Sequence, residues 1–301
     1  FGSSMIVQDE PHETGMATVA QAIRATRGKI CDLDSAVAWS LKQSAAAKAL
    51  EGRSLVYYNG AFSPPTRAHA HIARTIACDP DVDALWLDPE PARPGKLRWL
   101  DETLEARVAM CELVAEEVAT SHCDVGVGTL RRDLGFERGT SVELFHTLRA
   151  LLGGPGKGKL LWALGADVLE GMRYWDAKAR ACLQPGSTCD GIMLFMRNGW
   201  GSERLLKTAT EVLSPVGAAV GPQCEVRIVP MPSELATMSS SDARGELVEA
   251  IESNCDDTYY TSLSACNLKT ADVPSLLPSV ADYCLARPEI CAIYQSQCAR
   301  L

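Results

Sequence analysis

The sequence lacks the features that mark a membrane protein or a small secreted scaffold. No apolar run approaches the ~18 residues that a membrane-spanning helix needs, although hydrophobic residues make up 47% of the 301-residue chain. The 12 cysteines are scattered, and no C-x-x-C pair with zinc-ribbon spacing occurs among them. We interpret them as reduced, mostly buried thiols in a cytoplasmic or nuclear protein that is not secreted.

The basic residues are also fewer than the acidic residues. The chain has 29 Lys and Arg residues against 38 Asp and Glu residues, which gives a net charge of −9. Because nucleic-acid binding depends on neutralising many phosphates, this balance argues against a nucleic-acid partner. It does not argue against a small phosphorylated ligand, for which a few local cations are enough.

The first fifth of the chain differs from the rest. Phe1–Ser4 precede Met5 and are expected to be a cloning remnant. Residues 14–27 and 33–51 are rich in alanine and have helical apolar spacing, ahead of the first convincing strand. We therefore predict an N-terminal helical extension over residues 5–52 and one main domain over residues 53–301.

The main domain alternates between strand-like and helix-like segments. Strands are expected at residues 54–58, 84–87, 124–127, 159–164, 191–196 and 225–229. Helices are expected near residues 67–77, 101–120, 140–152, 203–213 and 277–294, the last broken at Pro288. This alternation predicts an α/β fold, a Rossmann-like doubly wound and mostly parallel sheet with C-terminal helices. Ligands of such sheets bind beyond the carboxyl ends of the strands.

The segment that follows the first expected strand, NGAFSPPTRAH, has the composition of a phosphate-binding loop. Gly60 permits a tight turn and a close approach to a ligand, and Pro64 and Pro65 stiffen the loop. Thr66 can cap the next helix, whose first turn would offer free N–H groups and the His69 ring to an anion. A plain surface turn before a capped helix would explain the same residues, and the segment alone does not decide between the two.

A second segment of this kind, SSSDAR, follows the last expected strand. The hydroxyls of Ser239, Ser240 and Ser241 at a helix start, with Arg244 one turn in, could form an anion cradle. An ordinary serine-capped helix is the simpler alternative.

A third segment follows the fourth expected strand. Gly165 permits a close ligand approach, Asp167 can accept a hydrogen bond from a ribose hydroxyl or an amide, and Trp175 can stack on a flat ring. A capped strand-to-helix turn with a core tryptophan would look the same.

Taken together, the three segments resemble the nicotinamide/nicotinate mononucleotide adenylyltransferase family. The first resembles the G-x-F-x-P-x-[HT]-x-x-H signature, the third resembles G-x-D-x-L…W, and the serine segment resembles I-S-S-T-x-I-R, with Met238 for Ile and Ser241 for Thr. The resemblance covers about residues 54–296. Ala68 departs from it, because many bacterial members have glycine there.

The resemblance implies a reaction and a set of site residues. A nucleotidyltransferase domain over residues 53–301 would join nicotinamide mononucleotide (NMN) or its nicotinate counterpart (NaMN) to ATP, giving NAD or its deamido form and pyrophosphate. Mg²⁺ would be bound mainly through the ATP phosphates, with no metal held by the protein alone. The implied catalytic residues are His69, Thr66 and Arg244. The implied ATP-binding residues are Gly60, Ala61, Phe62, His69, Gly165, Asp167, Ser239, Ser240, Ser241 and Arg244. The implied mononucleotide-binding residues are Phe62, Ser63, Lys96, Leu130, Trp175 and Arg197.

Two departures keep other functions open. Leu130 stands where family members often carry an aromatic residue that stacks on the pyridine ring, and Ala68 replaces a glycine. They favour a non-catalytic nucleotide-binding or chaperone-like relative, whereas the intact Thr66, His69 and Arg244 favour an enzyme. An adenylyltransferase with another acceptor, such as phosphopantetheine, is the third hypothesis. The sequence leaves open the choice between NMN and NaMN, the role of the N-terminal helices, and whether the chain forms a homo-oligomer.

Overall fold

The computed structural model describes residues 49–91, 99–133, 141–175, 180–183, 188–197, 199–213, 224–254 and 272–298. The expected cloning remnant, nearly all of the expected N-terminal extension, and Lys96 lie outside the described residues.

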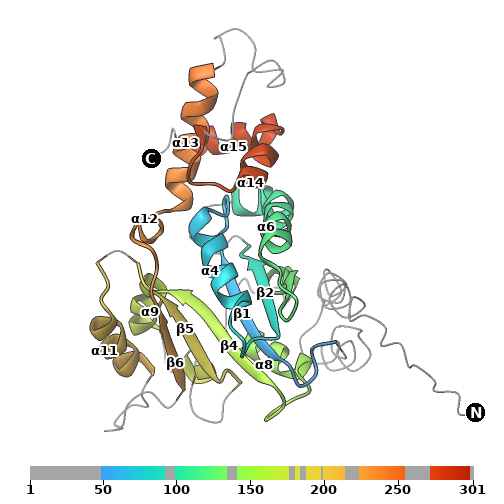
Figure 1. Ribbon diagram of the computed structural model, residues 1–301, viewed down its shortest axis with the longest axis vertical. Helices are drawn as coiled ribbons and strands as arrows, with labels where there is room; N and C mark the ends of the chain where they lie inside the picture. The colour runs from blue at the N-terminus through green and yellow to red at the C-terminus, as the bar shows by residue number, and fades with distance from the viewer. Residues whose placement is uncertain are drawn as a thin grey trace, which may run out of the picture.

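The centre of the fold is a six-stranded sheet in the order β3-β2-β1-β4-β5-β6 (Figure 1). The strands are β1 (Ser54–Gly60), β2 (Ala84–Pro89), β3 (Asp124–Val127), β4 (Lys159–Gly165), β5 (Gly191–Phe195) and β6 (Glu225–Val229). Every pair of neighbouring strands is parallel. The predicted α/β class and doubly wound parallel sheet are therefore confirmed. The strand order reverses between β1 and β4, which is where such sheets bind ligands.

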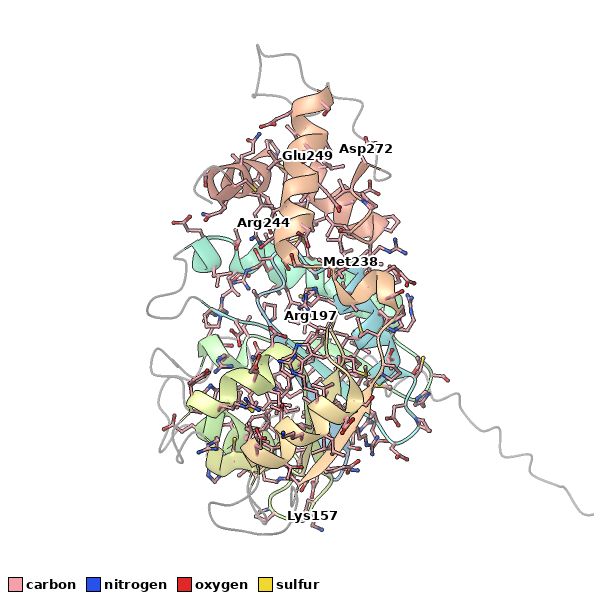
Figure 2. All side chains as sticks on the ribbon, turned by 90° about the vertical axis from the view of Figure 1, so that its left-hand side faces the viewer. Lys157, Arg197, Met238, Arg244, Glu249 and Asp272 are labelled. Carbon is pink, nitrogen blue, oxygen red and sulfur yellow. The ribbon has the colours of Figure 1, made fainter. Side chains whose placement is uncertain are left out.

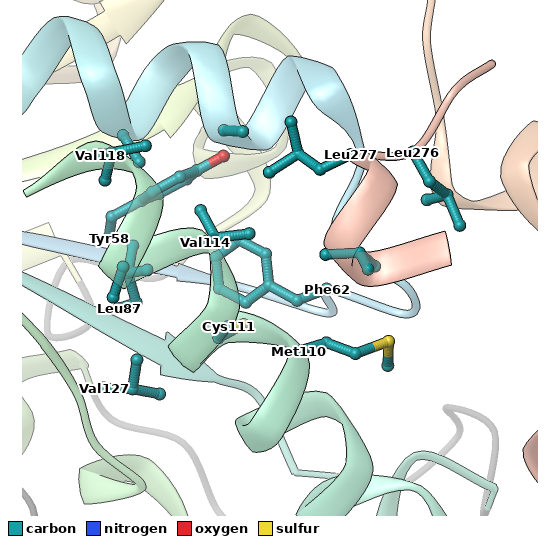
Figure 3. Packing of buried hydrophobic residues seen from close by; sticks show 14 of the residues in the cluster. Tyr58, Phe62, Leu87, Met110, Cys111, Val114, Val118, Val127, Leu276 and Leu277 are labelled. Atoms are coloured by element: carbon teal, nitrogen blue, oxygen red, sulfur yellow. The ribbon is translucent and has the colours of Figure 1, made fainter. Parts of the chain in front are cut away.

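The strands are apolar runs because helices cover both faces of the sheet. Alternate residues of β1 show this, since Val56 belongs to one hydrophobic cluster and Leu55 to the other. The first cluster joins the sheet to α4 (Arg67–Ala77), α6 (Leu104–Val118) and the C-terminal helices. The second joins it to α8 (Ser141–Leu151), α9 (Ala166–Gly171) and α11 (Ser202–Leu213). Figure 3 shows Phe62, from the loop after β1, packed in the first cluster beside Val114 and Met110 of α6.

Three C-terminal helices lie at one end of the molecule, beyond α4 and α6 (Figure 1). They are α13 (Ser240–Asn254), α14 (Pro278–Leu285) and α15 (Pro288–Cys298), and the predicted break at Pro288 is where α15 begins. Short elements complete the described parts: α5 (Trp99–Glu102), α7 (Leu130–Asp133), α12 (Ser233–Ala236), and the 3-10 turns η1 (Met172–Tyr174) and η2 (Ala181–Leu183).

The long helix expected near residues 101–120 is confirmed over most of its length as α6, but a turn at Thr103 separates α6 from α5. The buried hydroxyl of Thr103 accepts a hydrogen bond from Nε of Arg107, 3.1 Å away, at the start of α6. The nine described cysteines are free thiols, and seven of them are buried. Within the described ranges, the helices are each too short or too polar to cross a lipid bilayer.

Candidate active site

A cavity of about 460 Å³ opens at the carboxyl ends of β1, β4 and β5. Its size is typical of small-molecule sites. Several of the site residues expected from sequence line it together: Gly60, Ala61, His69, Gly165, Asp167, Trp175 and Arg197. Ala68, which replaces the common glycine, lines it as well.

Side-chain donors from two helices bind the carbonyl oxygens of the loop after β1. Nη1 of Arg107 donates to the oxygen of Ala61, 2.6 Å away, and Nη1 of Arg244 donates to the oxygen of Ser63 over the same distance. The hydroxyl of Ser240 donates to the oxygen of Pro64 at 2.8 Å. The peptide bond between Ser63 and Pro64 is cis. Donors from α6 and α13 thus fix the path of a loop that has no regular structure of its own.

Phe62 shapes the same loop from inside. It has a φ of +43°, and its buried ring packs edge-on against Tyr58 and His69, with 5.2 Å between centroids in both pairs. A Cβ atom on Gly60 would lie 3.4 Å from that ring, which is close packing for an added side chain. The Phe62 side chain is therefore a support for His69 and does not line the cavity.

The protonation state of His69 follows from its neighbours. Thr66 and His69 form a capping box at the start of α4, in which the Thr66 backbone N–H donates to Nδ1 of His69 at 3.0 Å. Because an amide can only donate, Nδ1 carries no proton and the neutral ring presents Nε2–H. Burial, and then the charge of Arg197, lower the His69 pKa to about 4. At neutral pH the ring is a neutral hydrogen-bond donor on the cavity wall.

The expected free amides at the start of α4 are mostly taken by protein acceptors. The Arg67 amide donates to the oxygen of Ser275 at 2.8 Å, and the His69 amide belongs to the capping box. The expectation that this helix end offers several N–H groups to an anion is therefore wrong. The imidazole of His69 remains the donor that the first turn of α4 presents to the cavity.

The third predicted segment forms the opposite wall. Gly165 ends β4 and caps α9, and a Cβ atom there would lie 2.6 Å from Oδ1 of Asp167. Glycine thus allows the Asp167 carboxylate to fold back beside the strand end. Nη2 of Arg197, just after β5, donates to the oxygen of Met238 at 2.9 Å. Figure 2 shows Arg197 and Met238 together in the middle of the molecule, with Arg244 farther along toward the C-terminal helices.

The serine segment and Arg244 contact the first loop, as a shared site requires, but they do so outside the cavity lining. The Arg244 guanidinium bridges Ser63 to the Ser241 hydroxyl, which lies 2.9 Å from Nη2, and is 7% exposed. The hydroxyl of Ser239 donates to the Asp242 carboxylate at 2.7 Å. Burial lowers the Arg244 pKa, though the group stays charged. Arg244 and Ser63 are 181 residues apart in the sequence, and the Arg244 guanidinium donates to the Ser63 carbonyl oxygen. The two sequence motifs therefore meet at the backbone of the loop.

Two expected mononucleotide contacts lie in the core instead of the cavity. Leu130 is fully buried in the second hydrophobic cluster, and Ser63 is buried with its hydroxyl 3.5 Å from that of Tyr294. Position 128, two residues before Leu130, accepts no residue larger than glycine, because a Cβ atom on Gly128 would lie 2.3 Å from the buried Trp86 ring. The residue beside Leu130, Arg131, lines the cavity.

Sequence reasoning missed four residues that line the cavity: Asn59, Glu90, Arg131 and Trp162. Together with Trp175, they form what we call the aromatic end of the cavity. Nε1 of Trp162 donates to Oδ1 of Asn59 at 2.8 Å, and the Asn59 amide nitrogen donates to Glu90. Nη1 of Arg131 lies 3.2 Å from the same carboxylate. The rings of Trp162 and Trp175 lie 6.0 Å apart with a 30° tilt. Polar residues directly after a buried strand, as in Asp88-Pro89-Glu90, were the signal that could have revealed this network.

The described residues contain no group of three or more His, Cys, Asp or Glu side chains placed to hold a metal ion. Of the two carboxylates that line the cavity, Glu90 is held by Asn59 and Arg131, which leaves Asp167 as the candidate oxygen ligand. This donor set fits a Mg²⁺ ion bound mainly through phosphate oxygens, since that ion needs few protein ligands.

No family model matches the chain. A probable nicotinate-nucleotide adenylyltransferase of Agrobacterium fabrum is 26% identical over 157 residues, which cover 49% of this chain and 78% of that protein. Over about half of its length, the chain is thus similar to a probable member of the nicotinate-nucleotide adenylyltransferase family.

Solved structures from that family have the same fold. The nicotinic acid mononucleotide adenylyltransferase of Plasmodium falciparum, complexed with NaAD, matches with a TM-score of 0.54 at 17% identity, over 77% of this chain and 95% of its own. The same enzyme complexed with APC matches with a TM-score of 0.52 at 16% identity, over 77% and 94% of the two chains. At this identity the likeness establishes the fold alone.

Proposed function

We propose that the chain is an adenylyltransferase that joins the phosphate of NMN or NaMN to the AMP part of ATP and releases pyrophosphate. The observation that carries the proposal is the composition of one cavity. His69 and Arg197 supply donors for phosphate, and Trp175 and Asp167 supply a ring surface and an acceptor, all around the same 460 Å³. The relationship to nicotinate-nucleotide adenylyltransferases supports the same acceptor class.

The chemistry suits a site without a catalytic acid–base pair. The attacking phosphate is already ionised at neutral pH, so no general base is needed. The difficulty is to bring two polyanions together and to stabilise the charge on the leaving group, which positioning and electrostatics accomplish. The neutral Nε2–H of His69 and the Arg197 guanidinium, which also holds Met238, would meet the reacting phosphates.

The other predicted contacts have separate places in this proposal. Lys96 remains the predicted partner of the attacking phosphate. Arg244 and the Ser239–Ser241 segment remain the predicted partners of the ATP phosphates, in addition to the contacts they make with the loop after β1. Trp175, with Trp162 behind it, takes the ring-stacking role for which Leu130 is too deeply buried. Mg²⁺ bound to the ATP oxygens would neutralise charge without a dedicated protein cage.

A pyrophosphate-release assay with ATP, Mg²⁺ and one acceptor at a time tests the proposal. We expect release with NMN, NaMN or both, and none with phosphopantetheine. Release with phosphopantetheine alone would move the chain to another acceptor class. ATP binding without release in any mixture would contradict the proposal and favour a nucleotide-binding relative without activity.

A further inference from the structure

A buried ion pair lies at the aromatic end of the cavity. The Arg131 and Glu90 side chains are 6% and 13% exposed, and Nη1 of Arg131 lies 3.2 Å from Oε1 of Glu90. Both residues line the cavity, next to Asn59 and the two tryptophans. A ring that stacks on Trp175 or Trp162 would thus share the cavity with a positively and a negatively charged side chain.

The network is anchored so that neither charge can easily move away. Asn59 links it to the aromatic wall, because its amide accepts from Trp162 and donates to Glu90. The backbone N–H of Arg131 donates to Oδ2 of Asp88 at 3.1 Å, and the Tyr57 hydroxyl donates to the same oxygen at 2.6 Å. Asp88 is fully buried, and burial raises its pKa to about 7. The ion pair is thus a rigid pair of complementary polar groups.

An amide and a carboxylate meet this pair differently. A nicotinamide group has both an acceptor oxygen and donor N–H bonds, so it can accept from Arg131 and donate to Glu90 at once. A nicotinate group is ionised and can only accept, so its second oxygen would face the Glu90 carboxylate. Like charges in a partly desolvated site repel each other, and separating Glu90 from Arg131 would lose the attraction between two largely buried charges.

We propose that the Glu90–Arg131 pair reads the substituent of the pyridine ring and makes NMN the preferred acceptor over NaMN. The inference rests on the proposed function and concerns the same cavity. It sets this chain apart from the relatives above, whose names specify nicotinate or nicotinic acid. Glu90 is the specificity-determining residue in this account, because its charge is what a carboxylate substituent would meet.

The unmodified protein provides the first test. Pyrophosphate release is measured at pH 7.5 with ATP and Mg²⁺, and kcat/KM is compared for NMN and NaMN. We expect NMN to be favoured on the order of tenfold or more, the penalty typical of a site whose polar groups are left unpaired by the wrong substrate. Equal use of both acceptors, or a preference for NaMN, would overturn the inference while the proposed function stands. No release with either acceptor would instead refute the proposed function.

Two variants should move the preference in opposite directions. Glu90→Gln removes the negative charge next to Arg131, so the ratio of kcat/KM for NMN to that for NaMN should fall on the order of tenfold. Arg131→Met removes the positive charge next to Glu90, so the same ratio should rise. The conservative variant Glu90→Asp keeps the charge and should keep the preference for NMN.

Glu105→Gln is the matched control. Glu105 pairs with Arg132, one residue along from Arg131, at 2.8 Å, but it is 81% exposed and does not line the cavity. The ratio of kcat/KM for NMN to that for NaMN should be the same in Glu105→Gln as in the unmodified protein. An unchanged ratio in folded Glu90→Gln, or shifts in the same direction in Glu90→Gln and Arg131→Met, would overturn the inference. If Glu90→Gln does not fold, the ratios of kcat/KM measured for Arg131→Met and for the unmodified protein still test the inference.

Discussion

At one end of the cavity, the loop after β1 is held by donors that bind its carbonyl oxygens, whereas at the other end side chains from the strand ends hold one another. The donors of the first end come from α6 and α13, and Arg244 reaches Ser63 across 181 residues. The second end is built from residues near the ends of β1, β2, β3 and β4 and contains opposite charges. Changes at the loop should therefore alter turnover and stability together, and changes at the ion pair should alter the choice of acceptor.

His69→Ala tests the catalytic side of this contrast and should have the largest effect. Removing the donor that faces the reacting phosphates should lower kcat by about 10²- to 10³-fold. The lost capping interaction should cost only about 1 kcal/mol of unfolding free energy. Pyrophosphate release and urea unfolding measure the two quantities.

His71→Ala is the control for that variant, because His71 lies on the same helix and does not line the cavity. Its turnover should match the unmodified protein. Near-normal turnover in His69→Ala would remove His69 from the mechanism.

Arg107→Met tests how far the loop depends on its support. Arg107 is fully buried and donates to the backbone oxygens of Ala61 and Leu100 and to the Thr103 hydroxyl. Losing these charged donors leaves buried acceptors unpaired, so the free energy of unfolding should fall by about 2–4 kcal/mol. Arg74→Met, which breaks a largely exposed pair with Glu117, should change it by less than about 1 kcal/mol. Equal effects of the two variants in urea unfolding would contradict this account of the loop.

Arg244→Lys sharpens the same comparison with a smaller change. A lysine keeps the charge but cannot reach both Ser63 and Ser241 with the fixed fork of a guanidinium. We expect kcat/KM to fall on the order of tenfold while the preference between NMN and NaMN stays the same. A shifted preference would mean that the two ends of the cavity are not independent.

The pH dependence of stability should show the smallest effect. The His69 pKa is lowered to about 4, so the unfolded chain takes up a proton before the folded protein does. Stability from this group is therefore present above pH 6.5 and is lost as the pH falls toward 4, by roughly 1–2 kcal/mol for a half-buried ring. Asp88 acts in the opposite direction, because its pKa is raised to about 7 and protonation favours the folded state.

The difference between the unmodified protein and His69→Gln isolates the histidine contribution. Urea unfolding at pH 7 and at pH 4.5 should give a larger acid-induced loss for the unmodified protein. An identical loss in both would show that His69 is not held neutral by its surroundings.

Much of the fold was predictable because its elements obey local rules. The expected ranges of the third strand, the sixth strand and the helix after the first loop match β3, β6 and α4 residue for residue. Apolar runs of this kind with intervening amphipathic segments leave few alternatives to a covered parallel sheet. The turn at Thr103 was missed because no glycine or proline beside it marks a break between α5 and α6.

The site was only partly predictable. Motifs placed Gly60, His69, Gly165, Asp167, Trp175 and Arg197 around one cavity, because strand ends and the turns after them have fixed directions. They did not give the direction of Arg244, which depends on how α13 packs against the loop. Nor did they separate Leu130 from Arg131, since a shift of one residue at the start of a short helix turns a side chain from the cavity to the core.

The contacts between the loop after β1 and the C-terminal helices have a consequence for biosynthesis. A nascent chain that has emerged from the ribosome as far as residue 239 contains all six strands but lacks Ser240, Arg244 and Tyr294. In this shorter chain the carbonyl oxygens of Ser63 and Pro64 lack the donors that α13 supplies. The loop that borders the candidate site is thus completed only after α13 has been made, and a product truncated before Ser240 would lack the donors that fix this loop.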